Sequence, residues 1–312
     1  MCAAEVVAAL DCGSNSTRLL IADSTGATLR REMRITRLSQ GVDAAGTLVD
    51  EALLRTYDVL DEYRRFMDVA SVQRGLLVAT SAVRDARNGM QFLVEAARLT
   101  GVPAELISGD QEASFSFEGA TTGLAPDPRP TVIVDVGGGS TELAINLDGE
   151  LHSYSMQLGC VRVSERALGH DVVTPEGAAA AREMINAELD RAFSAEAAFD
   201  AVRGDVRLVG LAGTVATLAS LDAQLTTYDR DAVHHRVLTR ATVQHWRDTL
   251  GAQTAQQRLS HPGMVVGRED VLVAGLFVLD AVMERFGVTQ LLSSENDILD
   301  GIVAFLLRPS SA

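Results

Sequence analysis

Short apolar runs rich in β-branched residues alternate along the chain with amphipathic segments. Apolar residues at 6–10 and 19–22 flank a short polar turn, which predicts two tightly joined strands. Residues 29–38 alternate loosely between apolar and polar positions and predict a third strand. Residues 50–70 carry apolar side chains three and four positions apart, which is typical of a helix with one buried face. Further elements of this half, a strand, a helix and a short strand, are expected at 75–79, 91–99 and 104–107.

A similar order of elements begins again after a stretch that contains three prolines, at 126–130. Apolar runs at 131–134 and 143–147 predict two strands, and a third follows directly. The later helices and strands are expected from Thr174-Pro175 and at 208–211, 268–286, 288–292 and 297–307. We therefore expect two α/β domains, residues 1–125 and 126–312, with a boundary close to the prolines. Whether the last helix packs on the first domain is left open.

Two polar turns resemble each other and occupy equivalent places in the two halves. Residues 11–17 read Asp-Cys-Gly-Ser-Asn-Ser-Thr, and residues 135–141 read Asp-Val-Gly-Gly-Gly-Ser-Thr. Each turn closes one expected strand and opens the next, which indicates a duplicated domain. Glycine-rich turns let backbone N–H groups approach phosphate closely, and hydroxyl groups add donors. The expected phosphate-binding residues are Gly13, Ser14, Asn15, Ser16, Gly137, Gly138, Gly139, Ser140 and Thr141.

A plain hairpin would explain either turn alone, but the repeated Ser and Thr residues favour phosphate binding. The glycines are not a dinucleotide-binding fingerprint, because that motif opens a helix and these glycines open a strand. Asp135 ends a strand and Glu142 follows the second turn, so both are candidate ligands of a divalent cation, with Asp11 as a third. An ordinary exposed strand residue is the alternative for Glu142. Gly213-Thr214 follows an apolar strand and is a further candidate phosphate contact.

Two charged residues are ambiguous on the residues alone. Glu112 falls in the first turn of a helix that a Ser108–Gln111 capping box begins. An acid is favoured there by the helix dipole, and on spacing alone this explanation is better than a general base. Arg84 follows a strand end, where a guanidinium would neutralise a transferred phosphoryl group. A surface ion pair with Asp85 is the simpler reading of Arg84 by itself.

The composition excludes several classes of reaction and of binding partner. The chain has 312 residues and a net charge of -15, and all 27 of its basic residues are arginine. The absence of lysine excludes Schiff-base chemistry and a P-loop lysine, and the acidity disfavours nucleic-acid binding. Cys2, Cys12 and Cys160 lack metal or redox spacing, so reduced thiols and the cytoplasm are expected. The longest apolar stretch, 271–279, is too short for a membrane span. The arginines at 30–37 are expected on a solvated face.

Taken together and in this order, the motifs resemble the exopolyphosphatase/guanosine pentaphosphate phosphohydrolase (Ppx/GppA) family over about residues 6–305. The resemblance rests on the two Asp/Gly turns and on four further segments. They are an Arg-Leu-x-x-Gly loop at 36–41, a Thr-Ser-Ala-x-Arg-x-Ala segment at 80–86, a Ser-Gly-x-x-Glu-Ala segment at 108–113, and the Gly-Thr pair at 213–214.

The resemblance implies two actin-like α/β domains with a cleft between them, of the ribonuclease H-like kind found in the sugar kinase and Hsp70 superfamily. It implies hydrolysis of the terminal phosphoanhydride of inorganic polyphosphate, with release of orthophosphate. Glu112 then becomes the general base, and Arg84 contacts the transferred phosphate. Mg²⁺, with Mn²⁺ as an alternative, is expected at Asp135 and Glu142. The family also suggests a link to the stringent response, and a homodimer is compatible with it.

Three other functions remain open at this point. A guanosine pentaphosphate 5′-phosphohydrolase would use the same chemistry, a kinase of the superfamily would need an acceptor site, and a sensor would bind without turnover. The family's C-terminal Gly-Leu-Arg-Glu-Gly stretch reads Asp-Ile-Leu-Asp-Gly here, at 297–301, so any role of that arginine is absent. The length is that of the short, two-domain members, without the extra helical domains of the long ones.

Overall fold

The computed structural model describes residues 5–308, which form two compact units. Unit 1 runs to Thr122 and resumes at Asp297, and unit 2 spans Gly123–Asn296. The last helix, α14 (Ile298–Leu307), is therefore part of unit 1, which answers the question that the sequence left open. Cys2 lies outside the described residues. In the described part of the chain, no helix has both the length and the hydropathy needed to cross a bilayer.

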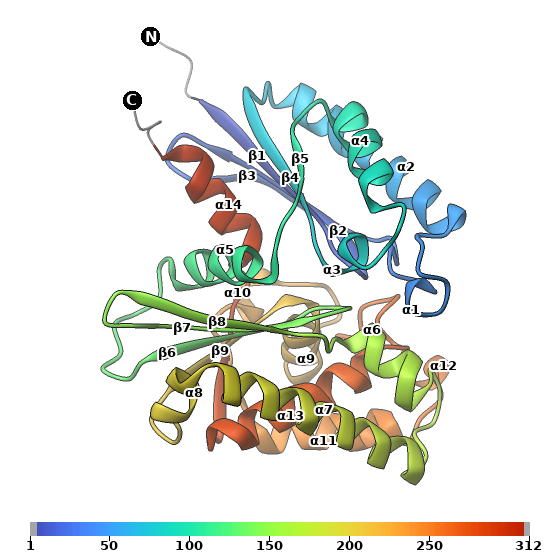
Figure 1. Ribbon diagram of the computed structural model, residues 1–312, viewed down its shortest axis with the longest axis vertical. Coiled ribbons are helices and arrows are strands. Elements are labelled where there is room, and N and C mark those ends of the chain that lie inside the picture. The colour runs from blue at the N-terminus through green and yellow to red at the C-terminus, as the bar shows by residue number, and fades with distance from the viewer. Residues whose placement is uncertain (1–4, 309–312) are drawn as a thin grey trace. The chain divides into compact units, whose positions relative to one another are not determined.

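Unit 1 is built on a five-stranded mixed sheet with the order β3-β2-β1-β4-β5 (Figure 1). Its strands are β1 (Val6–Cys12), β2 (Ser16–Asp23), β3 (Thr28–Ile35), β4 (Arg74–Ala79) and β5 (Ala104–Leu106). The first three strands form an antiparallel meander, and β4 and β5 then continue the sheet parallel to β1. The polar turn between β1 and β2 consequently lies at the edge where β1 and β4 end. Parallel strands that end together commonly bring loop residues together into a site.

Helices cover both faces of this sheet, as its alternating side chains require. Ala8, Leu10 and Cys12 of β1 belong to one apolar cluster with α2 (Asp50–Val69) and α4 (Gly89–Thr100). The intervening residues of β1 pack in a second cluster with α14. Figure 1 shows α2 and α4 on one side of the sheet and α5 (Gly109–Thr121) with α14 on the other. Cys12 is thus a packing residue, as expected, and burial raises the pKa of its thiol well above the ordinary value.

Unit 2 repeats this sheet and adds one strand. Its order is β10-β11-β9-β6-β7-β8. The strands are β6 (Thr131–Val136), β7 (Thr141–Leu147), β8 (Glu150–Met156), β9 (Arg207–Leu211), β10 (Val237–Thr239) and β11 (Gln290–Ser293). Within the sheet, the strands β8-β7-β6-β9-β11 have the same order and directions as the strands β3-β2-β1-β4-β5 of unit 1. The additional strand, β10, pairs antiparallel with β11 at the edge. The two mixed sheets confirm the expected fold of two actin-like α/β domains, and the cleft between them stays a prediction.

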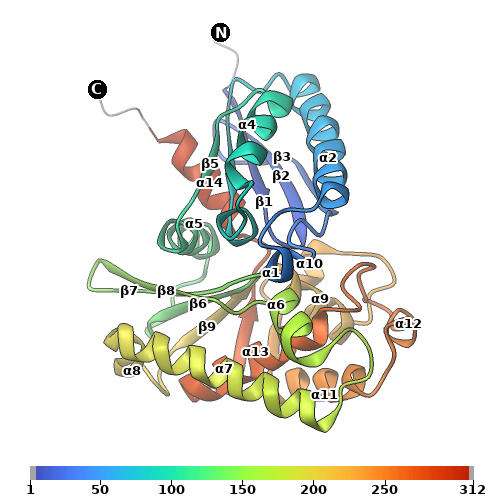
Figure 2. The same cartoon turned by 45° about the vertical axis from the view of Figure 1, so that its right-hand side comes forward.

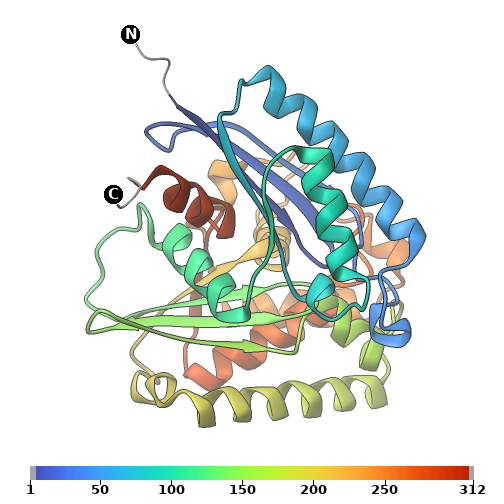
Figure 3. The same ribbon diagram turned by 45° about the horizontal axis from the view of Figure 1, so that its top comes forward.

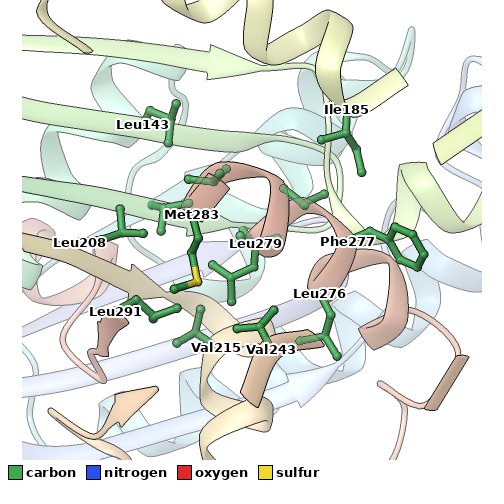
Figure 4. Close-up of a cluster of buried hydrophobic side chains, with 14 of the residues drawn as sticks. Leu143, Ile185, Leu208, Val215, Val243, Leu276, Phe277, Leu279, Met283 and Leu291 are labelled. Carbon is green, nitrogen blue, oxygen red and sulfur yellow. The ribbon is translucent and has the colours of Figure 1, made fainter. Parts of the chain in front are cut away.

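The core of unit 2 lies between this sheet and its helices. Leu143 and Leu208 of the sheet meet Ile185 of α7 (Pro175–Ala195) and Met283 of α13 (Leu272–Phe286) in one cluster (Figure 4). Figure 2 shows α7, α11 (Arg240–Gly251) and α13 gathered on one side of the sheet. The other helical segments of the chain are α1 (Val42–Ala45), α3 (Ser81–Arg84), α6 (Cys160–Val163), the π-helical η1 (Ser164–Leu168), α8 (Ala197–Ala201), α9 (Ala212–Asp222), α10 (Arg230–Val233) and α12 (Ala255–Arg258).

Candidate active site

The first Asp/Gly turn is held from behind by a segment of its own unit. The Gly13 N–H donates across the turn to the Ser16 carbonyl at 3.0 Å. The carbonyls of Ser14 and Asn15 accept three bonds, at 3.0 to 3.1 Å, from the amides of the segment 36–39 that follows β3. The carbonyls of the turn are therefore used, whereas the amides of Ser14 and Asn15 donate to no backbone carbonyl in the described part of the chain.

The second turn has the same construction. Amides at the start of α6, which follows β8, donate to the carbonyls of Gly137 and Gly138 at 2.9 to 3.2 Å. The Arg162 Nε donates to the Gly139 carbonyl at 2.8 Å. Gly159 lets α6 approach, because a Cβ there would lie 2.3 Å from the Gly138 carbonyl oxygen. Among residues 5–308, the amides of Gly138 and Gly139 also donate to no backbone carbonyl.

Each unit thus presents a turn whose carbonyls are occupied and whose amides are available. Successive free N–H groups form an anion-binding concavity, so both turns suit phosphate. In unit 1, Asn15 Nδ2 and Arg84 Nη2 are buried and have no hydrogen-bond partner among the described residues, which adds two donors. Thr141 differs from its expected role, because its hydroxyl donates to the Leu158 carbonyl at 2.5 Å and has no second proton for phosphate.

Arg84 and Glu112 come together within unit 1. Arg84 lies on the short α3 that follows β4, and its Nη1 donates to the Ile107 carbonyl at 2.9 Å. The same nitrogen is 3.8 Å from Oε2 of Glu112. Glu112 is buried in the first turn of α5, and the Ser108–Gln111 capping box that begins this helix is confirmed. The side chain of Glu112 therefore lies beside a guanidinium, a placement that the helix dipole alone does not explain.

Asp135 and Glu142 form a pair of carboxylates in unit 2. They lie directly opposite each other on the antiparallel strands β6 and β7, so their side chains share one face of the sheet. Both are buried, and Oε1 of Glu142 accepts from the Ser155 hydroxyl at 2.8 Å. Two adjacent buried carboxylates repel each other, and a divalent cation relieves that repulsion. This donor set suits Mg²⁺, which commonly binds one or two carboxylates together with water and substrate phosphate.

No cluster of three or more His, Cys, Asp or Glu side chains able to hold a metal occurs within residues 5–308. Asp11, the third expected ligand, has a different partner. Its cross-strand neighbour is Arg18, whose Nε and Nη2 donate to Oδ2 of Asp11 at 2.9 and 2.6 Å. Burial raises the pKa of Asp11, and Arg18 opposes that shift. The guanidinium occupies Oδ2 alone, and Oδ1 of Asp11 is buried without a hydrogen-bond partner among the described residues, so a metal role of Asp11 stays a prediction.

The Gly-Thr pair begins α9 immediately after β9. The Thr214 hydroxyl is buried and donates to the Val136 carbonyl at 3.4 Å. Gly213 lies against the guanidinium of Arg268, because a Cβ on Gly213 would be 1.8 to 2.1 Å from its atoms. Sequence reasoning did not single out Arg268, nor Arg18 or Arg162. Arg18 follows Asp11 at the same separation as Glu142 follows Asp135. Of the three arginines, Arg18 was therefore the one that the repeat in the sequence could have indicated.

Comparisons with known proteins show which family the chain belongs to. The model of the Ppx/GppA phosphatase family matches residues 20–307. A protein of Mycobacterium tuberculosis named exopolyphosphatase 2 is 40% identical over 316 residues, which cover 96% of this chain and 98% of the relative.

Two solved structures extend the likeness to the fold. One, of an exopolyphosphatase-like protein, has a TM-score of 0.91 and 33% identity and covers 97% of this chain and 99% of its own. The Aquifex aeolicus member of the Ppx/GppA family has a TM-score of 0.80 and 28% identity, with 99% and 100% covered. The relative and the two solved structures match nearly the whole chain, and the family model begins after the first Asp/Gly turn and includes the second turn and the helix that carries Glu112. The chain belongs to the Ppx/GppA phosphatase family.

Proposed function

We propose that this protein is an exopolyphosphatase, which hydrolyses the terminal phosphoanhydride of inorganic polyphosphate and releases orthophosphate. The observation that carries the proposal is the duplicated turn, with free amides in front and occupied carbonyls behind, in both units. A repeating polyanion suits two such cradles, since each can hold one phosphate group. The 40% identity to a protein named exopolyphosphatase 2 supports the same substrate class.

The chemical step would use Glu112 and Arg84 of unit 1. A water oxygen attacks the terminal phosphorus, the bond from phosphorus to the bridging oxygen breaks, and the shortened chain leaves with that oxygen. Glu112 would orient the water and accept its proton. Arg84, with Nη2 buried and without a partner among the described residues, would neutralise charge on the transferred group. Phosphoryl transfer asks mainly for such positioning and charge neutralisation.

Asp135 and Glu142 would hold Mg²⁺, with Mn²⁺ as the alternative ion. When bound, the ion would neutralise charge on the phosphate oxygens. This matters for capture of the substrate, because a net charge of -15 repels a polyanion over the molecule as a whole. The free amides, Arg84 and the bound ion would have to outweigh that field locally.

The test is phosphate release by the purified protein with Mg²⁺ on short polyphosphate, long polyphosphate and guanosine pentaphosphate. We expect release from polyphosphate that EDTA abolishes and added Mg²⁺ restores. Release from guanosine pentaphosphate alone would replace the proposal by the alarmone hydrolase. Binding of polyphosphate without any release would replace it by the sensor. The cytoplasmic location and the homodimer stay predictions.

A further inference from the structure

A row of ion pairs links the first turn of unit 1 to the start of α14. Arg18 lies at its centre. Two of its nitrogens bind Asp11, and the third, Nη1, donates to Oδ2 of Asp297 at 2.5 Å. Asp297 is the N-cap of α14, and its Oδ1 accepts from the Leu299 amide at 2.9 Å. One guanidinium therefore connects the aspartate before the phosphate turn to a helix far away in the sequence.

Arg31 forms the ion pairs at the other end of this row. Its Nη2 donates to Asp300 at 2.5 Å, and its Nη1 is 3.6 Å from Asp297. Arg31 was expected on a solvated face, but it is half-buried between the sheet and α14, whereas the side chains of Arg30 and Arg34 are more exposed. The expectation was wrong because the two acids come from a helix that nothing local in the sequence places beside β3.

The ionisation of these acids follows from the arrangement. Burial alone would raise the pKa of Asp297, but Arg18 and Arg31 together hold it below its ordinary range. Burial raises the pKa of Asp300, and Arg31 opposes that shift. Asp297 is thus the member of the pair that keeps its negative charge most firmly, and it is the member that contacts Arg18.

Asp297 is also fixed from its backbone. α5 and α14 lie side by side (Figure 3) and touch at two glycines. A Cβ on Gly119 of α5 would lie 1.9 Å from the Asp297 carbonyl oxygen, and a Cβ on Gly301 of α14 would lie 2.0 Å from the Phe115 carbonyl oxygen. This close approach locks the start of α14 against the helix that carries Glu112.

We propose that Asp297 is a positioning residue of the active site, which holds Arg18 against Asp11 and thereby fixes the first phosphate turn. The inference deepens the proposed function and rests on it. Asp297 does not contact the substrate. It acts through Arg18, whose planar group can serve both carboxylates at once only while Asp297 fixes its third nitrogen. Without Asp297, the guanidinium is free to rotate away from the geometry that orients Asp11.

The test compares Asp297→Asn, Arg18→Lys and the double variant. Asparagine is as good an N-cap as aspartate, so Asp297→Asn keeps an oxygen for the helix start and removes the negative charge and the second accepting oxygen that hold Arg18. Lysine cannot reproduce the fork of donors. We expect each single variant to lose about ten- to a hundredfold in kcat/KM on polyphosphate, as small misplacements do. We expect the double variant to lose no more than Arg18→Lys, because the two residues act as one unit.

A purely electrostatic role predicts the opposite sign. Removing a negative charge near a site for a polyanion would lower KM and leave kcat unchanged. That result, or losses in the double variant that are the sum of the single losses in free energy, would overturn the proposal. Asp297→Asn at the wild-type kcat/KM would overturn it as well.

Asp280 supplies the matched control. It is 8% exposed against 7% for Asp297, and it too is held by two arginines, Arg240 and Arg247. It lies on α13 in unit 2 and has no bond to either turn. Asp280→Asn should lower thermal stability and leave kcat/KM and KM unchanged. A kinetic loss in Asp280→Asn as large as that in Asp297→Asn would show that any broken ion pair has this effect.

A second readout does not depend on activity. Hydrogen exchange of the peptide that covers the β1–β2 turn, residues 12–17, should be faster in Asp297→Asn than in the wild type and unchanged in Asp280→Asn. Unchanged exchange in Asp297→Asn would overturn the inference even if the enzyme is an exopolyphosphatase. A wild-type protein that does not release phosphate from polyphosphate, but shows the faster exchange in the variant, would overturn the proposed function and leave the positioning of the turn established.

Discussion

Two aspartates end equivalent strands of the two units, and their cross-strand neighbours carry opposite charges. Asp135 faces Glu142, whereas Asp11 faces Arg18. The same backbone frame therefore carries a pair of carboxylates in unit 2 and a carboxylate paired with a guanidinium in unit 1. Sequence reasoning found both aspartates from their place before the turns. It did not find the arginine partner of Asp11, because that partner becomes visible only when the strands are paired in register.

At Glu112, we expect Glu112→Gln to lower kcat about a hundredfold to ten-thousandfold with little change in KM, because the amide cannot accept the proton of the attacking water. Steady-state kinetics on polyphosphate measures both values. Glu118→Gln is the control, since Glu118 lies on the same helix and is paired with Arg308. Turnover of Glu112→Gln at the wild-type rate would remove the general base from the mechanism.

At the carboxylate pair, we expect Glu142→Gln to raise the Mg²⁺ concentration that gives half-maximal activity by about tenfold or more, because one of two anionic ligands is lost. A Mg²⁺ titration of phosphate release measures the shift. Glu150→Gln, at the exposed start of the neighbouring strand β8, should titrate like the wild type. An unchanged Mg²⁺ requirement in Glu142→Gln would mean that the ion binds elsewhere.

At the scale of elements, the turns depend on the segments that follow the third strand of each sheet. Residues 36–39 support the first turn, and α6 supports the second. The strands, the capped helices and the turns were predictable, because each leaves a periodic or a capping signal within a few residues. The hydrogen bonds that support the turns were not predictable, because they join segments that only the sheet brings together. The helix expected at 268–286 begins at Leu272, because local turns within residues 265–271 precede it.

The contact at Gly159 makes this dependence testable. Gly159→Ala would place a methyl group 2.3 Å from the Gly138 carbonyl oxygen, so the second turn or α6 must shift. We expect a loss of about 1 to 3 kcal/mol in the free energy of unfolding, together with a clear loss of kcat/KM. Denaturant unfolding and steady-state kinetics measure the two effects. Gly251→Ala, whose new methyl group meets only ordinary contacts at 3.7 Å or more, should change neither by a similar amount.

At the scale of the whole molecule, unit 1 is discontinuous in sequence. Its sheet comes from the first part of the chain, but Val7, Ala9 and Leu20 on one face are packed against Ile298 and other apolar residues of α14. The proline-rich boundary was visible in the sequence because prolines interrupt elements locally. The return of the chain to unit 1 was not, because the last helix is apolar enough to suit either core.

A chain that stops after Asn296 should therefore keep unit 2 folded and lose the packing of unit 1. Trp246 is the single tryptophan and lies in unit 2, so its fluorescence reports that unit alone. We expect the tryptophan fluorescence of the shortened chain to show an unfolding transition with a midpoint close to that of the full chain. The far-UV circular dichroism of the shortened chain should have a lower amplitude. Ile302→Asp in the full chain should act in the same direction. Loss of both signals together would contradict two separately folding units.

The discontinuity also reverses the order in which the units can finish folding during synthesis. The ribosome makes β1 to β5 first, yet the apolar face that α14 covers stays open until all of unit 2 has been translated. Unit 2 is continuous and can close as soon as it emerges. During synthesis, the sheet of unit 1 therefore remains incompletely covered while unit 2 can already be folded. The first Asp/Gly turn, tied through Arg18 to Asp297, reaches its final form only when Asp297 and α14 have left the exit tunnel.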